Sequence, residues 1–228
     1  SLQTACAEVT PERHLVMLPL GVLLDNIGVY AALLAGASIH LPEHTGVRNN
    51  TLDIQRLMQV LHQAQPHSLI LVPQLLQGLL QAASAGLQPP DSLRFIAVGG
   101  GRIAPTLLNQ AAQLHWPVYQ GYGLSECASV VCLNRPSQHR PGSVGKALAH
   151  VQISLAEDGE VLVHGNGPLG YLDSVDPVPS PWPTGDIGRL DDGFLTILGR
   201  KKNQFITAFG RNVNPEWIEA ELTGEPGI

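Results

Sequence analysis

Short apolar runs rich in β-branched residues alternate with segments of helical periodicity from about residue 15 to residue 123, and this alternation most constrains the fold. The runs expected to form strands are 14–20, 37–42, 67–73, 93–99 and 117–123. The segments expected to form helices are Asp25–Leu34, Thr51–Ala64, Gln74–Ala85 and Pro105–Leu114. Because strands separated by helices usually pair in parallel, the sequence predicts an α/β fold with a mainly parallel sheet and flanking helices.

The rhythm changes after about residue 140, where short strands follow one another with Gly, Pro and Asp between them. The strands expected there are 151–155, 159–165, 182–190, 192–199 and 204–207. Strands in such close succession favour a small antiparallel β sheet or barrel. We therefore expect an α/β subdomain over residues 1–140, a small β subdomain over 141–200, and a hinge with the start of a further domain over 201–228.

Composition excludes several classes of protein. Of the 228 residues, 44% are hydrophobic and only 14% are charged, and the net charge is −6. Such a chain can form a core, and it lacks both the polarity of a disordered segment and the basic surface of a nucleic-acid-binding protein. Its three cysteines, Cys6, Cys127 and Cys132, show no CxxC spacing, which favours reduced thiols and a cytoplasmic location.

The apolar region between Leu15 and Leu41 is the place to look for a membrane span. Asp25 interrupts this region and Pro19 breaks its first part, so neither run reaches the ~20 residues that a spanning helix needs. Glu8 and Glu12 stand where an export signal would have a basic start. We therefore expect neither a transmembrane segment nor an export signal.

A triple glycine, Gly99–Gly101, follows the fourth expected strand and precedes the helix expected from Pro105. Backbone N–H groups in such a loop can approach a ligand closely. With Ala104 the run also satisfies GxGxxA, and Glu126 follows downstream, as in an NAD-dependent dehydrogenase. The position after the fourth strand weakens that alternative, and a plain strand-to-helix turn remains open.

The segment QGYGLSE (120–126) combines glycines, an aromatic ring, a hydroxyl and a carboxylate at the end of a strand. Ligands of parallel sheets bind outside the carboxyl ends of the strands. Tyr122 can stack on a base, Ser125 can bond a phosphate oxygen, and Glu126 can hold a hard cation such as Mg²⁺. A tight turn capped by Ser and Glu explains the same residues without a ligand.

Two later segments add a carboxylate and a basic run. In TGDIGRL (184–190), Asp186 follows a Thr-Gly turn and can accept hydrogen bonds from two adjacent ribose hydroxyls. In the segment that begins at residue 199, Arg200, Lys201 and Lys202 concentrate positive charge, which in isolation is equally typical of a solvated loop. The order in which all these segments occur carries more information than any one of them.

That order resembles the adenylate-forming superfamily, which includes acyl-CoA synthetases, nonribosomal peptide adenylation domains and luciferases. The segments that carry the resemblance are QGYGLSE (120–126), PGSVGK (141–146), GEVLVHG (159–165) with GY (170–171), TGD (184–186) and GRKKNQFITAFGRNVNPEWIE (199–219). The resemblance extends from LPL near residue 18 to the end of the chain. It makes residues 1–140 the expected nucleotide- and acyl-binding subdomain.

The resemblance also implies a role for each matching residue. Glu126 would be the Mg²⁺ ligand, Ser125 the α-phosphate contact and Lys202 the hinge between domains. The residues implied to bind the nucleotide are Gly99, Gly100, Gly101, Tyr122, Gly123, Asp186 and Arg200. Among these, Tyr122 would stack on adenine, Asp186 would accept from the ribose diol and Arg200 would be a second ribose contact. The triple glycine would border adenine and the acyl pocket.

The implied reaction is attack of a carboxylate on the α-phosphate of ATP, followed by attack of a thiol on the acyl adenylate. The thiol would belong to coenzyme A or to a carrier protein, and the acid is expected to be a fatty acid or another apolar acid. The motivation for an apolar acid is the Leu-, Ala- and Val-rich composition of 31–39 and 69–80.

The sequence also departs from the family pattern. Ser125 stands where Thr is usual, Asn203 and Ile206 replace an Asp and a Lys, and Val22 replaces a His or aromatic residue after LPL. The phosphate loop with its Lys would precede residue 1, and a second catalytic Lys would follow residue 228. The sequence therefore predicts an internal fragment, and the alternative to a ligase is a piece that binds AMP or ATP without turnover.

Overall fold

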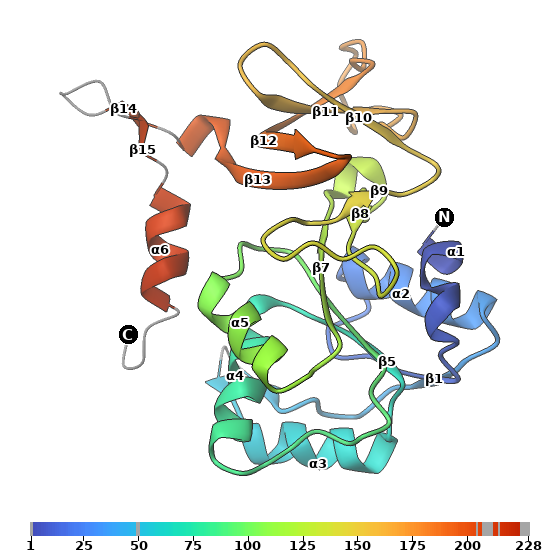
Figure 1. Ribbon diagram of the computed structural model, residues 1–228. Helices are drawn as coiled ribbons and strands as arrows, with labels where there is room; N and C mark the ends of the chain where they lie inside the picture. The colour runs from blue at the N-terminus through green and yellow to red at the C-terminus, as the bar shows by residue number, and fades with distance from the viewer. Residues whose placement is uncertain (1, 49–50, 204, 207–211, 214, 224–228) are drawn as a thin grey trace. The chain divides into compact units, whose positions relative to one another are not determined.

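The computed structural model describes residues 2–48, 51–203, 205–206, 212–213 and 215–223, and the chain divides into two compact units (Figure 1). The parallel unit comprises Leu2–Gly101 and Leu107–Tyr119, and the antiparallel unit comprises Arg102–Thr106 and Gln120–Ile228. Parallel strands with helices come first and antiparallel strands follow, so the predicted fold class is confirmed. The domain bounds expected from the sequence stay a proposal.

In the parallel unit, hydrogen bonds join the strands in the order β2-β1-β5-β6, and every pair is parallel. These strands are β1 (Arg13–Leu15), β2 (Ser38–His40), β5 (Ser68–Leu71) and β6 (Phe95–Val98). The helices between these strands are α2 (Leu23–Leu34), α3 (Ile54–Ala64) and α4 (Pro73–Ser84), and α5 (Pro105–Gln113) follows β6. The smaller elements are α1 (Leu2–Cys6), η1 (Ala7–Val9), β3 (Val47–Arg48) and β4 (Thr51–Leu52).

The first strand is shorter than the expected run 14–20, for a reason that lies in α2. Beyond β1, the backbone N–H groups of Met17 and Leu18 donate to Oδ2 of Asp25, at 2.9 and 2.7 Å. Asp25 lies in the first turn of α2, as expected, and its side chain is fully buried. A carboxylate acceptor thus replaces the strand neighbour, and β1 ends at Leu15.

The helix expected from Thr51 begins later, at Ile54. Thr51 and Leu52 form β4, which pairs antiparallel with β3. Asp53 is then the N-cap, because its Oδ1 accepts from the backbone N–H of Arg56 at 3.0 Å. Periodicity alone assigned Thr51, Leu52 and Asp53 to the helix, but the first two residues form a hairpin strand and the third caps the helix.

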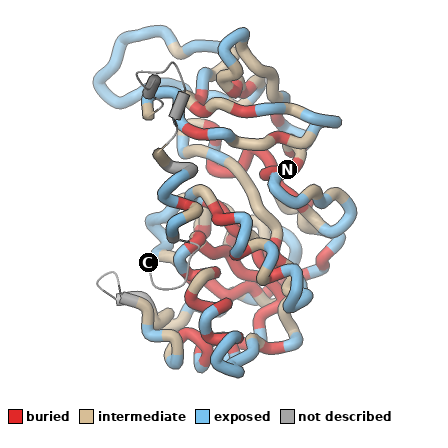
Figure 2. Tube along the Cα trace, turned by 60° about the vertical axis from the view of Figure 1, so that its left-hand side comes forward, coloured by how far each residue is buried: buried red, intermediate tan, exposed pale blue. Residues whose placement is uncertain are grey.

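Apolar side chains of the strands and helices form the core of the parallel unit. Figure 2 marks the buried residues along the chain in red. The most buried members of this core are Leu15, Met17, Leu57, Val60, Leu61, Leu69, Leu71, Leu76, Leu79, Leu80 and Ile96. The helix α3 shows why the periodicity works, since Leu57, Val60, Leu61 and Ala64 are buried while Gln59 and Gln63 are exposed.

In the antiparallel unit, the strand order is β10-β11-β12-β13-β9-β8-β7. The strands are β7 (Val118–Tyr122), β8 (Cys132–Leu133), β9 (Lys146–Ala147), β10 (Gln152–Leu155), β11 (Glu160–His164), β12 (Trp182–Asp191) and β13 (Phe194–Arg200). The strand β7 begins in the parallel unit, and its last residues pair antiparallel with β8. Antiparallel pairing therefore starts before residue 140.

The end of the antiparallel unit contains short elements. They are the 3₁₀ helices η2 (Ser125–Cys127) and η3 (Lys201–Asn203), the paired strands β14 (Phe205–Ile206) and β15 (Asn212–Val213), and α6 (Pro215–Thr223). The sequence pattern of Pro215–Leu222, with a proline at its start, predicts a helix there, and α6 confirms it. Residues 204 and 207 of the expected strand 204–207, and 208–211 and 214 of the last motif, lie outside the described residues. Within the described ranges, every helix is too short or too polar to cross a lipid bilayer.

Candidate functional site

Tyr122, Asp186 and Arg200 lie together in the antiparallel unit, although the chain separates them widely. The Tyr122 hydroxyl donates to Oδ2 of Asp186 at 2.6 Å, and Nε of Arg200 is 2.9 Å from Oδ1 of the same carboxylate. Asp186 and Arg200 are cross-strand partners on β12 and β13, while Tyr122 ends β7. The Asp186 carboxylate is thus held from both sides by residues that the sequence assigned to one nucleotide site.

The burial of Tyr122 and Asp186 decides which of them donates and which accepts hydrogen bonds. Asp186 is 4% exposed, whereas the Arg200 side chain is 44% exposed. Burial raises the pKa of the Tyr122 phenol far above its ordinary value, and the hydrogen bond to Asp186 raises this pKa further. Tyr122 is therefore a protonated donor at neutral pH. A carboxylate oxygen can accept more than one hydrogen bond, so Asp186 can also accept from the hydroxyls of a ligand.

The Thr184–Gly185–Asp186 segment is bonded to the neighbouring strand β11. The Thr184 hydroxyl donates to the carbonyl of Val161 at 2.8 Å and accepts from the N–H of Asp186 at 3.1 Å. The Gly185 N–H donates to Oε1 of Glu160 at 2.9 Å. Sequence reasoning missed Glu160, although the residue stands in the GEVLVHG segment that it quoted.

The turn that carries Ser125 and Glu126 is the 3₁₀ helix η2. Ser125 is exposed, and Oε1 of Glu126 accepts from the Tyr171 hydroxyl at 3.2 Å. The Asn166 side chain also donates to the carbonyl of Cys127 at 2.8 Å. The segment 166–171 therefore braces this turn, and only the quoted GY pair pointed to Tyr171.

Gly123 is required by a close approach of two backbone segments. A Cβ atom at this position would overlap the carbonyl of Ser129 and would also lie too close to Cα of Val130. The chain after Tyr122 therefore runs directly against the segment that follows η2. This contact gives the predicted site residue Gly123 a structural role, whether or not a nucleotide binds beside it.

The donor set fits Mg²⁺ that is shared with a phosphate ligand. Within the described residues, no group of three or more His, Cys, Asp or Glu side chains is placed to hold a metal by itself. Mg²⁺ is commonly held by one or two carboxylates and completed by substrate phosphates and water. The half-buried Glu126 carboxylate, next to the exposed Ser125 hydroxyl, is suited to such a partial site.

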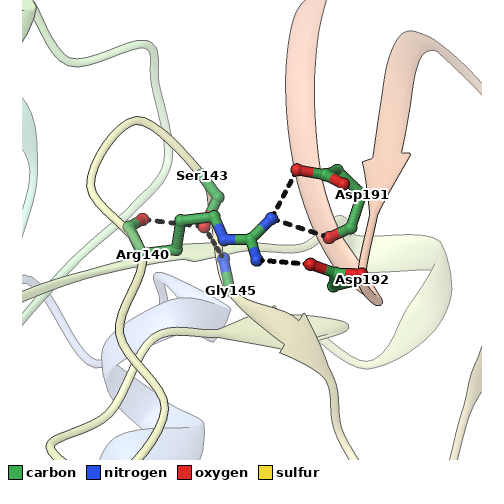
Figure 3. Close-up of polar contacts among 5 residues, drawn as sticks. All are labelled: Arg140, Ser143, Gly145, Asp191 and Asp192. Atoms are coloured by element: carbon green, nitrogen blue, oxygen red, sulfur yellow. Dashed lines mark hydrogen bonds and ion pairs between the residues drawn. The ribbon is translucent and has the colours of Figure 1, made fainter.

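The PGSVGK segment is attached to the β12–β13 turn through Arg140 (Figure 3). The guanidinium donates to Oδ2 and the carbonyl of Asp191, at 2.6 and 3.0 Å, and to Oδ2 of Asp192 at 3.0 Å. It also lies 4.4 Å above the centre of the Phe194 ring. Within the segment, Ser143 donates to the Arg140 carbonyl and accepts from the Gly145 N–H. These contacts indicate a structural role for the motif.

The remaining predicted site residues are Gly99–Gly101 and Lys202. Gly99–Gly101 belong to the parallel unit and follow β6, and α5 begins only at Pro105. The helix start thus does not adjoin Gly101, which weakens the dinucleotide alternative further. Lys202 is exposed in η3. The hypothesis that these residues share one ligand with Tyr122 stays a prediction.

Cys127 and Cys132 are buried thiols, as expected for small apolar side chains. Burial is the main cause that raises the pKa of Cys127 to about 11 and that of Cys132 to about 12. Both thiols are therefore protonated at neutral pH and are poor nucleophiles.

Comparison with known proteins identifies relatives that are named as CoA ligases. The family model described as AMP-binding enzyme matches residues 2–172. The 2-succinylbenzoate–CoA ligase of Bacillus velezensis is 31% identical over 238 residues, which cover 95% of this chain and 46% of that protein. The long-chain-fatty-acid–CoA ligase FadD15 of Mycobacterium bovis is 40% identical over 118 residues, or 49% of this chain and 20% of that protein. The chain spans less than half the length of these curated relatives.

Solved structures agree with the fold. O-succinylbenzoate coenzyme A synthetase (MenE) from Bacillus subtilis, in complex with AMP, aligns with a TM-score of 0.80 at 25% identity, over 99% of this chain and 49% of that chain. The anthranilate CoA ligase AuaEII, at 20% identity and a TM-score of 0.82 over 96% of this chain and 45% of that chain, supports the fold alone. The match over residues 2–172, which is most of the chain, shows that the chain belongs to the AMP-binding enzyme family.

Proposed function

We propose that the protein carrying this chain activates a carboxylic acid with ATP and transfers the acyl group to coenzyme A. The observation that carries the proposal is the buried Asp186 carboxylate, held between the Tyr122 hydroxyl and the Arg200 guanidinium. This arrangement occurs in a chain of the AMP-binding enzyme family. The names of the relatives, 2-succinylbenzoate–CoA ligase and long-chain-fatty-acid–CoA ligase, support the same reaction class.

Asp186 is proposed to bind the ribose of the nucleotide. Two adjacent ribose hydroxyls are donors that one carboxylate can accept together, and Tyr122 with Arg200 orients the carboxylate for them. Tyr122 is proposed to stack its ring on adenine while its hydroxyl keeps the bond to Asp186. Arg200, which is partly exposed, supplies a second contact to the ribose.

Ser125 and Glu126 are proposed to face the phosphates. The exposed Ser125 hydroxyl can donate to an α-phosphate oxygen, and the Glu126 carboxylate would hold Mg²⁺. When bound, Mg²⁺ neutralises phosphate charge that develops during the transfer. Tyr171 limits the rotation of Glu126 by its hydrogen bond to Oε1, and so prepares the carboxylate for this role.

The chemistry proceeds in two balanced steps. A carboxylate oxygen of the acid attacks the α-phosphorus of ATP, and the bond to the β-phosphate bridging oxygen breaks, which gives acyl-AMP and pyrophosphate. The thiolate sulfur of coenzyme A then attacks the acyl carbon, and AMP leaves. Lys202, after the last strand of the antiparallel sheet, is proposed as the hinge for a domain movement between the steps.

The acid is proposed to be apolar, either an aryl acid or a fatty acid. The relatives act by name on 2-succinylbenzoate, which is an aryl acid, and on long-chain fatty acids. Gly99, Gly100 and Gly101 are proposed to border the acyl pocket and adenine. We also propose a cytoplasmic reaction, which agrees with the buried unpaired thiols of Cys127 and Cys132.

The test is release of pyrophosphate with a panel of acids. The chain and the full open reading frame that encodes it are incubated with ATP, Mg²⁺ and one acid at a time: 2-succinylbenzoate, octanoate, palmitate and acetate. We expect release that depends on the aryl or long-chain acid and falls at least about a hundredfold in Asp186→Ala, because a bond between charged and hydroxyl groups is lost. Absence of acid-dependent release by the full reading frame would overturn the proposal.

Further measurements separate the acceptors and the alternative functions. Thioester formed with coenzyme A but not with a phosphopantetheinylated carrier protein supports a CoA ligase, and the reverse result supports a carrier-loading domain. Binding of AMP by the chain without any pyrophosphate release indicates a nucleotide-binding piece that lacks turnover. Quenching by NAD that is lost in Gly101→Val would instead support the dehydrogenase alternative.

A further inference from the structure

We infer that Glu160 is a positioning residue that couples the Thr184–Gly185–Asp186 segment to Lys201, the residue before the proposed hinge. The inference rests on the proposed function, since it assigns to Glu160 the placement of the carboxylate proposed to bind ribose. Its structural part concerns contacts within the antiparallel unit alone.

The segment that Glu160 holds is an irregularity in the sheet. Along β11, Glu160 pairs with Ile187 and Leu162 pairs with Pro183, so more residues of β12 than of β11 lie between these two pairs. The extra length interrupts the pairing of Thr184–Asp186 with β11, while Asp186 still pairs with Arg200 of β13. A second register shift, between β12 and β13, follows between Ile187 and Gly188. Backbone groups in such a bulge need partners other than a strand neighbour.

Glu160 supplies one of these partners with a charged acceptor. Its Oε1 accepts from the Gly185 N–H at 2.9 Å, and its Oε2 lies 2.8 Å from Nζ of Lys201. The Glu160 side chain is 13% exposed, so both interactions are partly shielded from water. One carboxylate therefore joins the residue before Asp186 to the residue after Arg200, the two partners of the proposed ribose site.

Lys201 has a second acidic partner, and this partner provides a matched control. Asp158 Oδ2 also contacts Nζ of Lys201, and Asp158 Oδ1 accepts from the Glu160 backbone N–H at 3.1 Å, so among the described residues these contacts do not involve Gly185. The Lys201 pKa is raised, first by Asp158 and then by Glu160. Removing the Asp158 charge thus weakens the Lys201 contact and spares the Gly185 bond, whereas removing Glu160 breaks both.

This arrangement gives Glu160 an effect on Asp186 that a surface ion pair would not have. With Glu160 in place, Gly185 is held, and Asp186 is directed at Tyr122 and Arg200. If Lys201 moves away when the proposed hinge turns, Glu160 loses its cation and its hold on Gly185 becomes weaker. The hinge position and the hold on the nucleotide would then change together.

Amide hydrogen exchange of Gly185, measured by NMR on the chain, tests the structural part. We expect Glu160→Ala to speed Gly185 exchange about 10- to 100-fold, Glu160→Gln to restore most protection because its amide oxygen still accepts, and Asp158→Asn to change it less than about twofold. Lys201→Met should speed exchange about two- to fivefold. The Leu195 amide, bonded to the Gly145 carbonyl, serves as the reference that reports global unfolding.

The affinity of the same variants for AMP, measured by calorimetry, tests the functional part. We expect about tenfold weaker binding in Glu160→Ala, an intermediate loss in Glu160→Gln and Lys201→Met, and wild-type affinity in Asp158→Asn. Unchanged Gly185 exchange in Glu160→Ala overturns the inference whether or not AMP binds. Equal AMP affinity in Glu160→Ala and wild type also overturns it. If the wild-type chain binds no AMP, the ribose role proposed for Asp186 is not supported in this chain, while the exchange data still decide whether Glu160 holds the bulge.

Discussion

The hydroxyl of Tyr122 donates a 2.6 Å hydrogen bond to Oδ2 of Asp186, which lies 64 residues further along the chain. The bond joins the end of β7 to β12, two strands that are not neighbours in the sheet order. It therefore depends on the tertiary arrangement of the antiparallel unit. The buried Asp186 carboxylate is thus a shared partner of Tyr122 and Arg200, which belong to two other motifs.

Tyr122→Phe removes the hydroxyl and leaves the ring. We expect the free energy of unfolding to fall by about 1.5–3 kcal/mol, since the Tyr122 hydroxyl donates to a buried ionised carboxylate. Urea denaturation followed by circular dichroism measures this change. A Tyr30→Phe variant is the control for loss of a tyrosine hydroxyl at an exposed position. Equal stability of Tyr122→Phe and wild type would contradict the assignment.

The raised pKa of Tyr122 gives a prediction about alkaline pH. The unfolded phenol ionises near 10.0, while the folded phenol keeps its proton to higher pH because it is buried and bonded to Asp186. Above pH 10 the unfolded state therefore binds fewer protons, and the free energy of unfolding should fall by up to about 1.4 kcal/mol per pH unit. Below that pH the stabilisation is complete. Urea midpoints across this range should fall more steeply in wild type than in Tyr122→Phe, and parallel curves would refute the prediction.

Asp25 and Asp53 both lie near helix starts, but Asp25 is buried and Asp53 is exposed. We therefore expect their replacement by Ala to lower the free energy of unfolding by different amounts. Asp25→Ala leaves the Met17 and Leu18 amides without their acceptor, and the nearby buried His14 ring loses its acidic neighbour, so we expect a loss of about 3–5 kcal/mol. Asp53→Ala removes one exposed N-cap bond and should cost about 1 kcal/mol. The two variants are compared by urea denaturation, and equal losses would show that burial is not the cause.

Gly123→Ala should disrupt the turn before η2. The added Cβ meets backbone atoms of Ser129 and Val130, which cannot move aside as a side chain would. We expect a loss of more than about 3 kcal/mol or failure to fold, because overpacking against backbone is severe. Gly167→Ala is the matched control, since its Cβ makes only an ordinary contact with Trp182. Thermal unfolding measures both, and a stable Gly123→Ala protein would contradict the close approach.

Arg140→Lys tests whether geometry or charge holds the PGSVGK segment to the β12–β13 turn. Asp191 and Asp192 are mostly exposed, so charge alone should contribute little, whereas the fork bonds two carboxylates and a carbonyl and covers Phe194. We expect Arg140→Lys to lose about 1 kcal/mol, nearly as much as Arg140→Ala. High salt should change wild-type stability only slightly. Full recovery by Lys would show that charge is sufficient.

Much of the fold followed from local patterns. The helix bounds of α4 and α5 lie within one residue of the expected segments, because apolar spacing and, for α5, the proline at its start are local signals. Pro73, which was expected to end the preceding strand, instead begins α4. The start of α3 was wrong by a few residues, since nothing local showed that Thr51 and Leu52 would pair with β3. Strand ends were also wrong where a side chain, such as Asp25, replaced a strand neighbour.

The sequence by itself determined the order of strands and helices, the change from parallel to antiparallel pairing, and the motifs that led to the AMP-binding enzyme family. Those features are periodic or contiguous, so they can be read along the chain. Only the tertiary structure decided that Tyr122 and Arg200 share the Asp186 carboxylate, and that Glu160 joins Gly185 to Lys201. Such contacts depend on the register of the strands, because a shift of one residue turns every side chain of a strand to the opposite face. They also depend on the bulge in β12.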